Sequence, residues 1–132
     1  MVELAALVRT SLAPHAGKKV HLDGIPEKKE RNARENVLPA GAREAPIVAL
    51  VDLTTFGSAK DALVVTPTHL YAKELDDQVS FPLADVVRVV REAGVGHTYV
   101  EVEVRALGTL RVPVGFSDEA VLALLKTLAA RG

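Results

Sequence analysis

The chain has 132 residues with a formal net charge of −1; 48% of its residues are hydrophobic and 25% are charged. This length and apolar content predict one folded domain rather than a disordered chain, and the balanced charge gives no overall attraction to nucleic acid or anionic lipid. Cysteine and tryptophan are absent, which excludes disulfides and thiolate metal sites and leaves Val, Leu and Ala to fill the core.

Residues 1–45 are predicted to form a helical extension that packs on the following domain. Residues 2–13 carry an apolar stripe at helical spacing, and Pro14 ends the run. The stripe consists of Leu4, Leu7, Val8 and Leu12. Two interpretations stay open for this helix: it binds a partner, or it covers one end of the domain core.

The same N-terminal segment bears on localisation. It has an acidic Glu3 and no cationic region before its apolar residues, unlike a signal peptide. No apolar run approaches the roughly 20 residues that a membrane-spanning helix needs. We therefore expect a cytoplasmic protein with no stable membrane insertion.

A short strand is possible at residues 18–22, and a second helix is predicted from Pro26 to Leu38. Glu27–Arg31 and Glu30–Arg34 are spaced to form ion pairs along this helix. Few large apolar residues occur in it, which favours a solvated surface helix over one whose basic face binds phosphate.

The periodicity changes to that of strands after residue 46. Short β-rich runs are separated by turns, and at 86–91 the density of valine favours a strand over a helix. Residues 98–105 alternate apolar and polar side chains, and Pro113 indicates an edge or a bulge in the last run. The seven predicted strands are 47–53, 62–66, 69–73, 79–83, 86–91, 98–105 and 110–114.

The chain closes with a predicted amphipathic helix. Ser117 is a good N-cap, and acidic residues follow it at the positive end of the helix dipole. Its apolar stripe consists of Val121, Leu124, Leu125 and Leu128. Seven strands followed by this helix predict an α+β, mainly β, fold in which a curled sheet or barrel is capped by the C-terminal helix.

The segments DALVVTPTHLYAKE and VSFPLADVVRVV carry a family resemblance. Together with the order of seven strands and a helix, they resemble a bacterial pleckstrin-homology-like (PH-like) domain of the PH and GRAM superfamily. The resemblance covers roughly residues 46–131 of the predicted domain, which spans residues 46–132, and leaves the first 45 residues outside it. It implies a non-enzymatic binding module.

The resemblance also suggests where binding occurs. PH domains that bind phosphoinositides cluster Lys and Arg on their first strands and loop, whereas here that region has Lys60 alone, which speaks against phosphoinositide binding. A protein partner is the leading expectation, with self-assembly as a scaffold and a lipid or small-ligand carrier as alternatives. The predicted contact residues are Thr55, Phe56, Gly57, Ser58 and Lys60.

No pattern typical of catalysis or cofactor binding occurs. The four histidines are scattered without metal-ligand spacing, and no phosphate-binding glycine loop is present. Ser58 and Lys60 are one residue too close for a Ser-x-x-Lys pair, and Asp76-Asp77 lacks the rest of a calcium loop. We therefore expect no enzymatic activity, catalytic residue, metal or cofactor, and no nucleic-acid binding.

Overall fold

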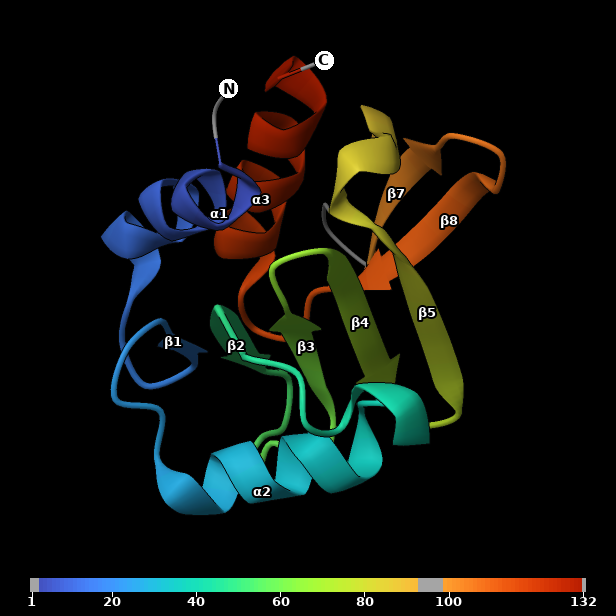
Figure 1. Ribbon diagram of the computed structural model, residues 1–132. Helices are drawn as coiled ribbons and strands as arrows, with labels where there is room; N and C mark the ends of the chain where they lie inside the picture. Colours follow the sequence, from blue (N-terminus) through green and yellow to red (C-terminus); the bar gives the residue numbers. More distant parts are fainter. Residues whose placement is uncertain (1–2, 93–98, 132) are drawn as a thin grey trace.

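The computed structural model describes residues 3–92 and 99–131, which form two antiparallel sheets with helices packed around them (Figure 1). The larger sheet has the strand order β1-β2-β3-β4-β5, and the smaller has the order β6-β7-β8. The strands are β1 (Val20–His21), β2 (Ala49–Asp52), β3 (Ala62–Val65), β4 (His69–Glu74), β5 (Asp77–Pro82), β6 (Val86–Arg91), β7 (Tyr99–Val104) and β8 (Gly108–Pro113). The helices are α1 (Leu4–Leu12), α2 (Glu27–Asn36) and α3 (Asp118–Arg131).

The α+β, mainly β, class predicted from the sequence is confirmed, and each predicted strand overlaps an observed one. The strand at 86–91 and the possible strand at 18–22 are both present. Of the predicted curled sheet or barrel, the barrel is wrong, because the strands form two separate sheets. Within the described residues β5 and β6 do not pair, because the chain leaves the first sheet at Pro82 and makes a 3₁₀ turn at Leu83–Asp85 before entering the second.

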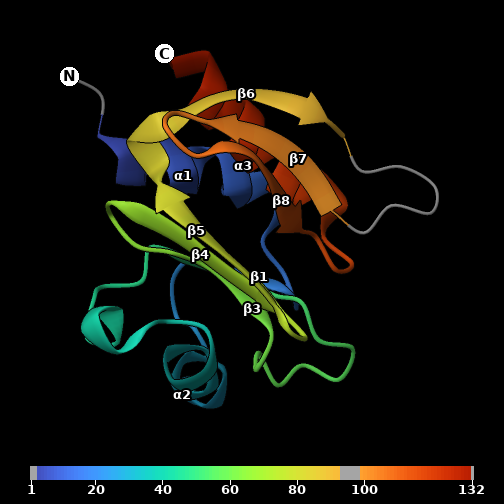
Figure 2. The same ribbon diagram turned by 90° about the vertical axis from the view of Figure 1, so that its right-hand side faces the viewer.

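The main core lies between the two sheets and the pair of helices α1 and α3 (Figures 1 and 2). The predicted alternation in β7 is confirmed, since Val100, Val102 and Val104 are buried there. The stripe predicted for the last helix is also confirmed. All four of its side chains are fully buried: Val121, Leu124, Leu125 and Leu128.

Helix α1 packs against α3 and contributes to the same core. Val8 and Leu12 of the predicted stripe are fully buried, together with Ala5, whereas Leu4 and Leu7 are half-buried. Pro14 follows the helix inside a 3₁₀ turn, but Ala13 before it keeps a helical conformation, with φ −52° and ψ −43°, so the expected displacement of that residue from the helical region is wrong. The arrangement agrees with the interpretation in which this helix covers one end of the core.

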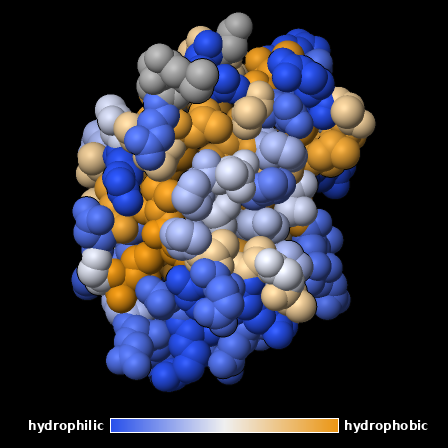
Figure 3. All heavy atoms as spheres, in the orientation of Figure 1, coloured by the Kyte–Doolittle hydropathy of each residue, from blue (hydrophilic) through white to orange (hydrophobic). Residues whose placement is uncertain are grey.

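Helix α2 covers the opposite face of the five-stranded sheet, where a second, smaller core forms. Ala33 of α2 packs there with Leu50 of β2 and Val64 of β3, so the central strands are buried on both faces. The outward face of α2 is charged, and the end of the molecule where it lies is hydrophilic in Figure 3. Of the two ion pairs predicted along α2, the one between Glu30 and Arg34 is present, with 3.4 Å between Arg34 Nε and Glu30 Oε2.

Candidate functional site

The predicted contact residues lie on the loop that joins β2 to β3, residues 53–61. Phe56 is at its tip, and its side chain is 98% exposed. Thr55 and Lys60 are also exposed, whereas Ser58 is half-buried. The structure therefore places the five residues on one loop, with a large aromatic side chain pointing into solvent.

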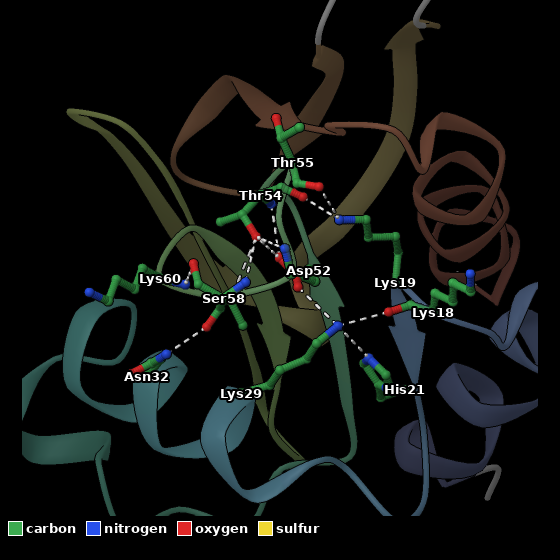
Figure 4. Close-up of polar contacts among 12 residues, drawn as sticks. Lys18, Lys19, His21, Lys29, Asn32, Asp52, Thr54, Thr55, Ser58 and Lys60 are labelled. Atoms are coloured by element: carbon green, nitrogen blue, oxygen red, sulfur yellow. Dashed lines mark hydrogen bonds and ion pairs between the residues drawn. The ribbon is translucent and has the colours of Figure 1, made fainter.

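The side chain of Thr54 organises the backbone of this loop. Its Oγ1 accepts N–H groups from Gly57 at 3.1 Å and Ser58 at 3.0 Å, and donates its own hydrogen to Asp52 Oδ1 at 2.5 Å (Figure 4). Gly57 has φ +84°, a conformation that side-chain-bearing residues rarely adopt, so glycine is favoured at this turn. One hydroxyl thus fixes the path of the chain on both sides of Phe56.

Asp52 anchors Thr54 from inside the protein. It ends β2, its side chain is fully buried, and its Oδ1 also accepts the backbone N–H of Thr54 at 2.9 Å. Its Oδ2 lies 3.0 Å from Lys29 Nζ, whose side chain is 15% exposed. No hydrogen bond of normal geometry reaches Oδ2 within the described residues, and the ammonium of Lys29 is the charged group that faces this oxygen.

Burial disfavours the charged form of Asp52, but its pKa lies below the usual value. The hydrogen bonds from Thr54 and the ammonium of Lys29 outweigh the desolvation. Lys29 also donates to the carbonyl of Lys18 at 2.8 Å and lies 3.2 Å from His21 Nε2. Burial and the nearby Lys29 charge lower the pKa of His21, which favours the neutral imidazole.

Two further side chains hold the loop from its flanks. Lys19 Nζ, next to β1, donates to the carbonyl of Thr54 and lies 3.4 Å from that of Thr55. Asn32 of α2 donates to the carbonyl of Ser58 at 2.7 Å. In Figure 4 the side chain of Lys60 points away from this network. The loop is therefore fixed from β1 and α2, while its exposed side chains take no part in the fixing.

Two further exposed apolar side chains, Leu75 and Phe116, lie close to the loop or to a residue that supports it. A pocket of about 320 Å³ separates the loop from the β4–β5 turn, and Leu75 of that turn, 75% exposed, lines it together with Phe56. Phe116 is also exposed, and its ring centroid lies 5.9 Å from Nζ of Lys19, the side chain that donates to the loop. We call Phe56, Leu75 and Phe116 the apolar rim.

The residues that organise the loop were not among the predicted contacts. Asp52 stood out in the sequence as the one charged residue of an apolar run, and a threonine two residues after an aspartate is typical of local side-chain-to-backbone bonding. Lys19 and Lys29 gave no such signal, because solvated lysines on a polar helix or connector are common.

The histidines do not gather at this loop, apart from His21. The ring of His69 stacks on Tyr71 with centroids 5.8 Å apart, and His97 lies outside the described residues. Within the described residues no three His, Asp or Glu side chains are placed to hold a metal ion. Over the same residues, no helix combines the length and apolar character that crossing a bilayer requires.

Comparisons with protein-family models, curated proteins and solved structures gave no match.

Acidification is expected to destabilise the protein partly through Asp52. Because its folded-state pKa is depressed, the stability that its carboxylate contributes is fully present above the unfolded pKa of about 3.9 and is lost as the pH falls through the folded value. Urea unfolding of wild type and Asp52→Asn between pH 7 and 2 measures this. The difference between the two proteins should shrink below about pH 4, and a difference that stays constant across the range would contradict the assignment.

Proposed function

We propose that this chain is a non-enzymatic, PH-like binding module that recognises a protein partner through Phe56 and the loop that carries it. The observation that carries the proposal is the 98% exposure of Phe56 on a loop whose backbone is fixed by buried groups. A phenylalanine in solvent gains free energy when a partner buries it, and aromatic side chains dominate many interfaces. A loop that is already ordered loses little conformational entropy on binding.

The order of the elements supports the PH-like part of the proposal. The strands β2–β5 form one antiparallel meander, β6–β8 form a second, and α3 follows, which is the order that the family resemblance leads us to expect. Helices α1 and α2 and strand β1 are additions to that plan.

A positioning role for the buried ion pair supports binding over catalysis. Asp52 is fully buried, and its oxygens face Thr54 and Lys29 rather than solvent. A general base must lie within hydrogen-bonding reach of its substrate, and the loop and α2 separate this carboxylate from any molecule in solution. The pair instead holds the loop that presents Phe56.

Replacing Phe56 with alanine is expected to reduce partner binding at least about tenfold, the loss typical of an interfacial aromatic hot spot. The measurement is a quantitative pull-down with the full chain as bait, followed by titration of the recovered protein in purified form. Leu107→Ala is the matched control, because Leu107 is an exposed apolar residue on the β7–β8 turn and lies outside the apolar rim. A double variant with Lys60→Ala tests whether the loop cation adds to the effect.

Two outcomes would count against this function. Equal partner recovery by wild type and Phe56→Ala, with circular dichroism showing both folded, removes the loop as the contact. Sedimentation that shows a dimer of the wild type, reduced to a monomer by Phe56→Ala, replaces the protein partner with a second copy of this chain.

A further inference from the structure

The five-stranded sheet ends at β5, whose outer edge has no strand paired to it among the described residues. Figure 2 shows this strand on the side of the molecule that faces the viewer. Gln78 and Ser80 near its middle are exposed. An open strand edge presents backbone N–H and C=O groups that another chain can pair with.

The register identifies which backbone groups face outward. The β4–β5 ladder is regular from Glu74↔Asp77 to His69↔Pro82, and Leu83 N donates to Thr68 O at 2.9 Å just beyond it. In an antiparallel pair, hydrogen-bonded and non-hydrogen-bonded positions alternate. The N–H and C=O groups of residues 77, 79 and 81 therefore face β4, and those of residues 78 and 80 face outward.

Pockets flank β5 on both faces of the sheet. One, of about 470 Å³, lies between β5 and the C-terminal end of α2 and is lined by Tyr71 and Ser80. The other, also about 470 Å³, lies between β5 and β8 and is lined by Val79, Leu110 and Pro113. Successive side chains of a strand point to opposite faces, so a strand added to β5 would direct alternate side chains toward the two pockets.

The rim of the second pocket is acidic. Glu74 and Asp77 line it, and burial together with the charges of Asp61 and Asp77 raises the pKa of Glu74. The cation beside them, Lys73, lies 2.7 Å from Asp61 and is engaged there. A basic side chain from outside would relieve the repulsion among these carboxylates.

The arginine of this pocket is also engaged within the protein. Arg111 lies 3.8 Å from Glu101 and its guanidinium lies 4.7 Å from the ring centroid of Tyr99. Arg111 lies on β8, on the far side of the second pocket from β5. The charged groups of this pocket at its β5 end are therefore the carboxylates of Glu74 and Asp77.

We propose that the outer edge of β5 binds an extended segment of a partner protein, which adds a strand to the sheet and places a Lys or Arg beside Glu74 and Asp77. A second copy of β5 fits the edge less well, because the segment Asp77–Pro82 has no basic residue to offer. This site does not depend on Phe56, and either proposal can fail without the other.

The test is a selection of random nine-residue peptides displayed on phage against the full chain, followed by fluorescence anisotropy with the selected peptides. Ser80→Pro removes an outward N–H without touching the bonds to β4, and Ser80→Ala is the matched control that keeps the N–H. The selected peptides should carry a basic residue near one end. Their affinity should fall at least about tenfold in Ser80→Pro and stay within about threefold in Ser80→Ala.

Hydrogen exchange on the wild type provides a readout that does not depend on the proline variant folding. Peptide binding should slow the exchange of the Gln78 and Ser80 amides. The double variant Glu74→Gln with Asp77→Asn should bind the peptides more weakly than the wild type, whereas the control variant Glu27→Gln on α2 should bind them equally well. Four outcomes overturn the site: no peptide enriched over a blank surface, equal affinity for both Ser80 variants, amide protection confined to other strands, or a wild-type dimer that Ser80→Pro dissociates.

Discussion

Replacing Asp52 with alanine is expected to lower the free energy of unfolding by about 3 kcal/mol. The substitution leaves the ammonium of Lys29, only 15% exposed, without its counter-charge, and removes the acceptor for both the N–H and the hydroxyl of Thr54. Breaking one side of a buried ion pair is costly because the remaining charge stays desolvated. Urea denaturation followed by circular dichroism, extrapolated to water, measures the change.

The matched control is Asp61→Ala. Asp61 Oδ1 lies 2.7 Å from Lys73 Nζ, so this ion pair is shorter than the one at Asp52. The side chains of Asp61 and Lys73 are, however, both partly exposed to solvent. Such a pair is worth at most about 1 kcal/mol, because water screens its charges. If the two substitutions lower the free energy of unfolding equally, burial does not determine how much Asp52 stabilises the protein. The assignment of Asp52 as a buried anchor for the loop would then be wrong.

Loop order gives a second readout on the same variant. Loss of Asp52 frees the hydroxyl of Thr54 to rotate, so the N–H groups of Gly57 and Ser58 lose a fixed acceptor. Amide exchange at these two residues should quicken more than global unfolding accounts for. The same variant should also bind the Phe56 partner more weakly, because the loop must then be ordered on binding.

Strand β7 and the last helix were predictable because each buries one face. Val100, Val102 and Val104 alternate with polar residues, and the leucines of α3 recur at helical spacing, so periodicity alone identified both elements. The division into two sheets was not predictable in this way. It depends on how the chain turns at Leu83–Asp85, and a turn of three residues has no periodicity to detect.

The position of the candidate loop was predicted, but the groups that build it were not. Phe56 and Lys60 stood out as an aromatic and a cation in a turn, whereas the interaction of Asp52 with Lys29 joins β2 to a helix far upstream in the sequence. Pairings between distant elements leave no local pattern. The open edge of β5 was unpredictable for the same reason, since strand neighbours follow from the topology and not from the composition of one strand.

Replacing Leu12 with alanine is expected to cost about 3 kcal/mol in the free energy of unfolding, within the range for a buried leucine that leaves a cavity. Leu12 is fully buried at the end of α1, in the core that also holds the stripe of α3. Thr10→Ala is the control: Thr10 is exposed, and its hydroxyl donates to the carbonyl of Ala6 in its own helix. Its cost should stay within about 0.5 kcal/mol.

The shape of the Leu12→Ala transition tests whether α1 and the following domain unfold as one unit. Because α1 and α3 share one core, a single cooperative transition with an unchanged denaturant slope is expected, shifted to lower urea. If α1 were a loosely attached extension of a domain that folds alone, the helix would detach first. Two transitions, or a loss below about 1 kcal/mol with α3 still protected from amide exchange, would show this. A single cooperative transition would show that α1 belongs to the same folding unit as β1, which pairs with β2. Lys19, next to β1, donates to the carbonyl of Thr54, so this unit also supports the Phe56 loop.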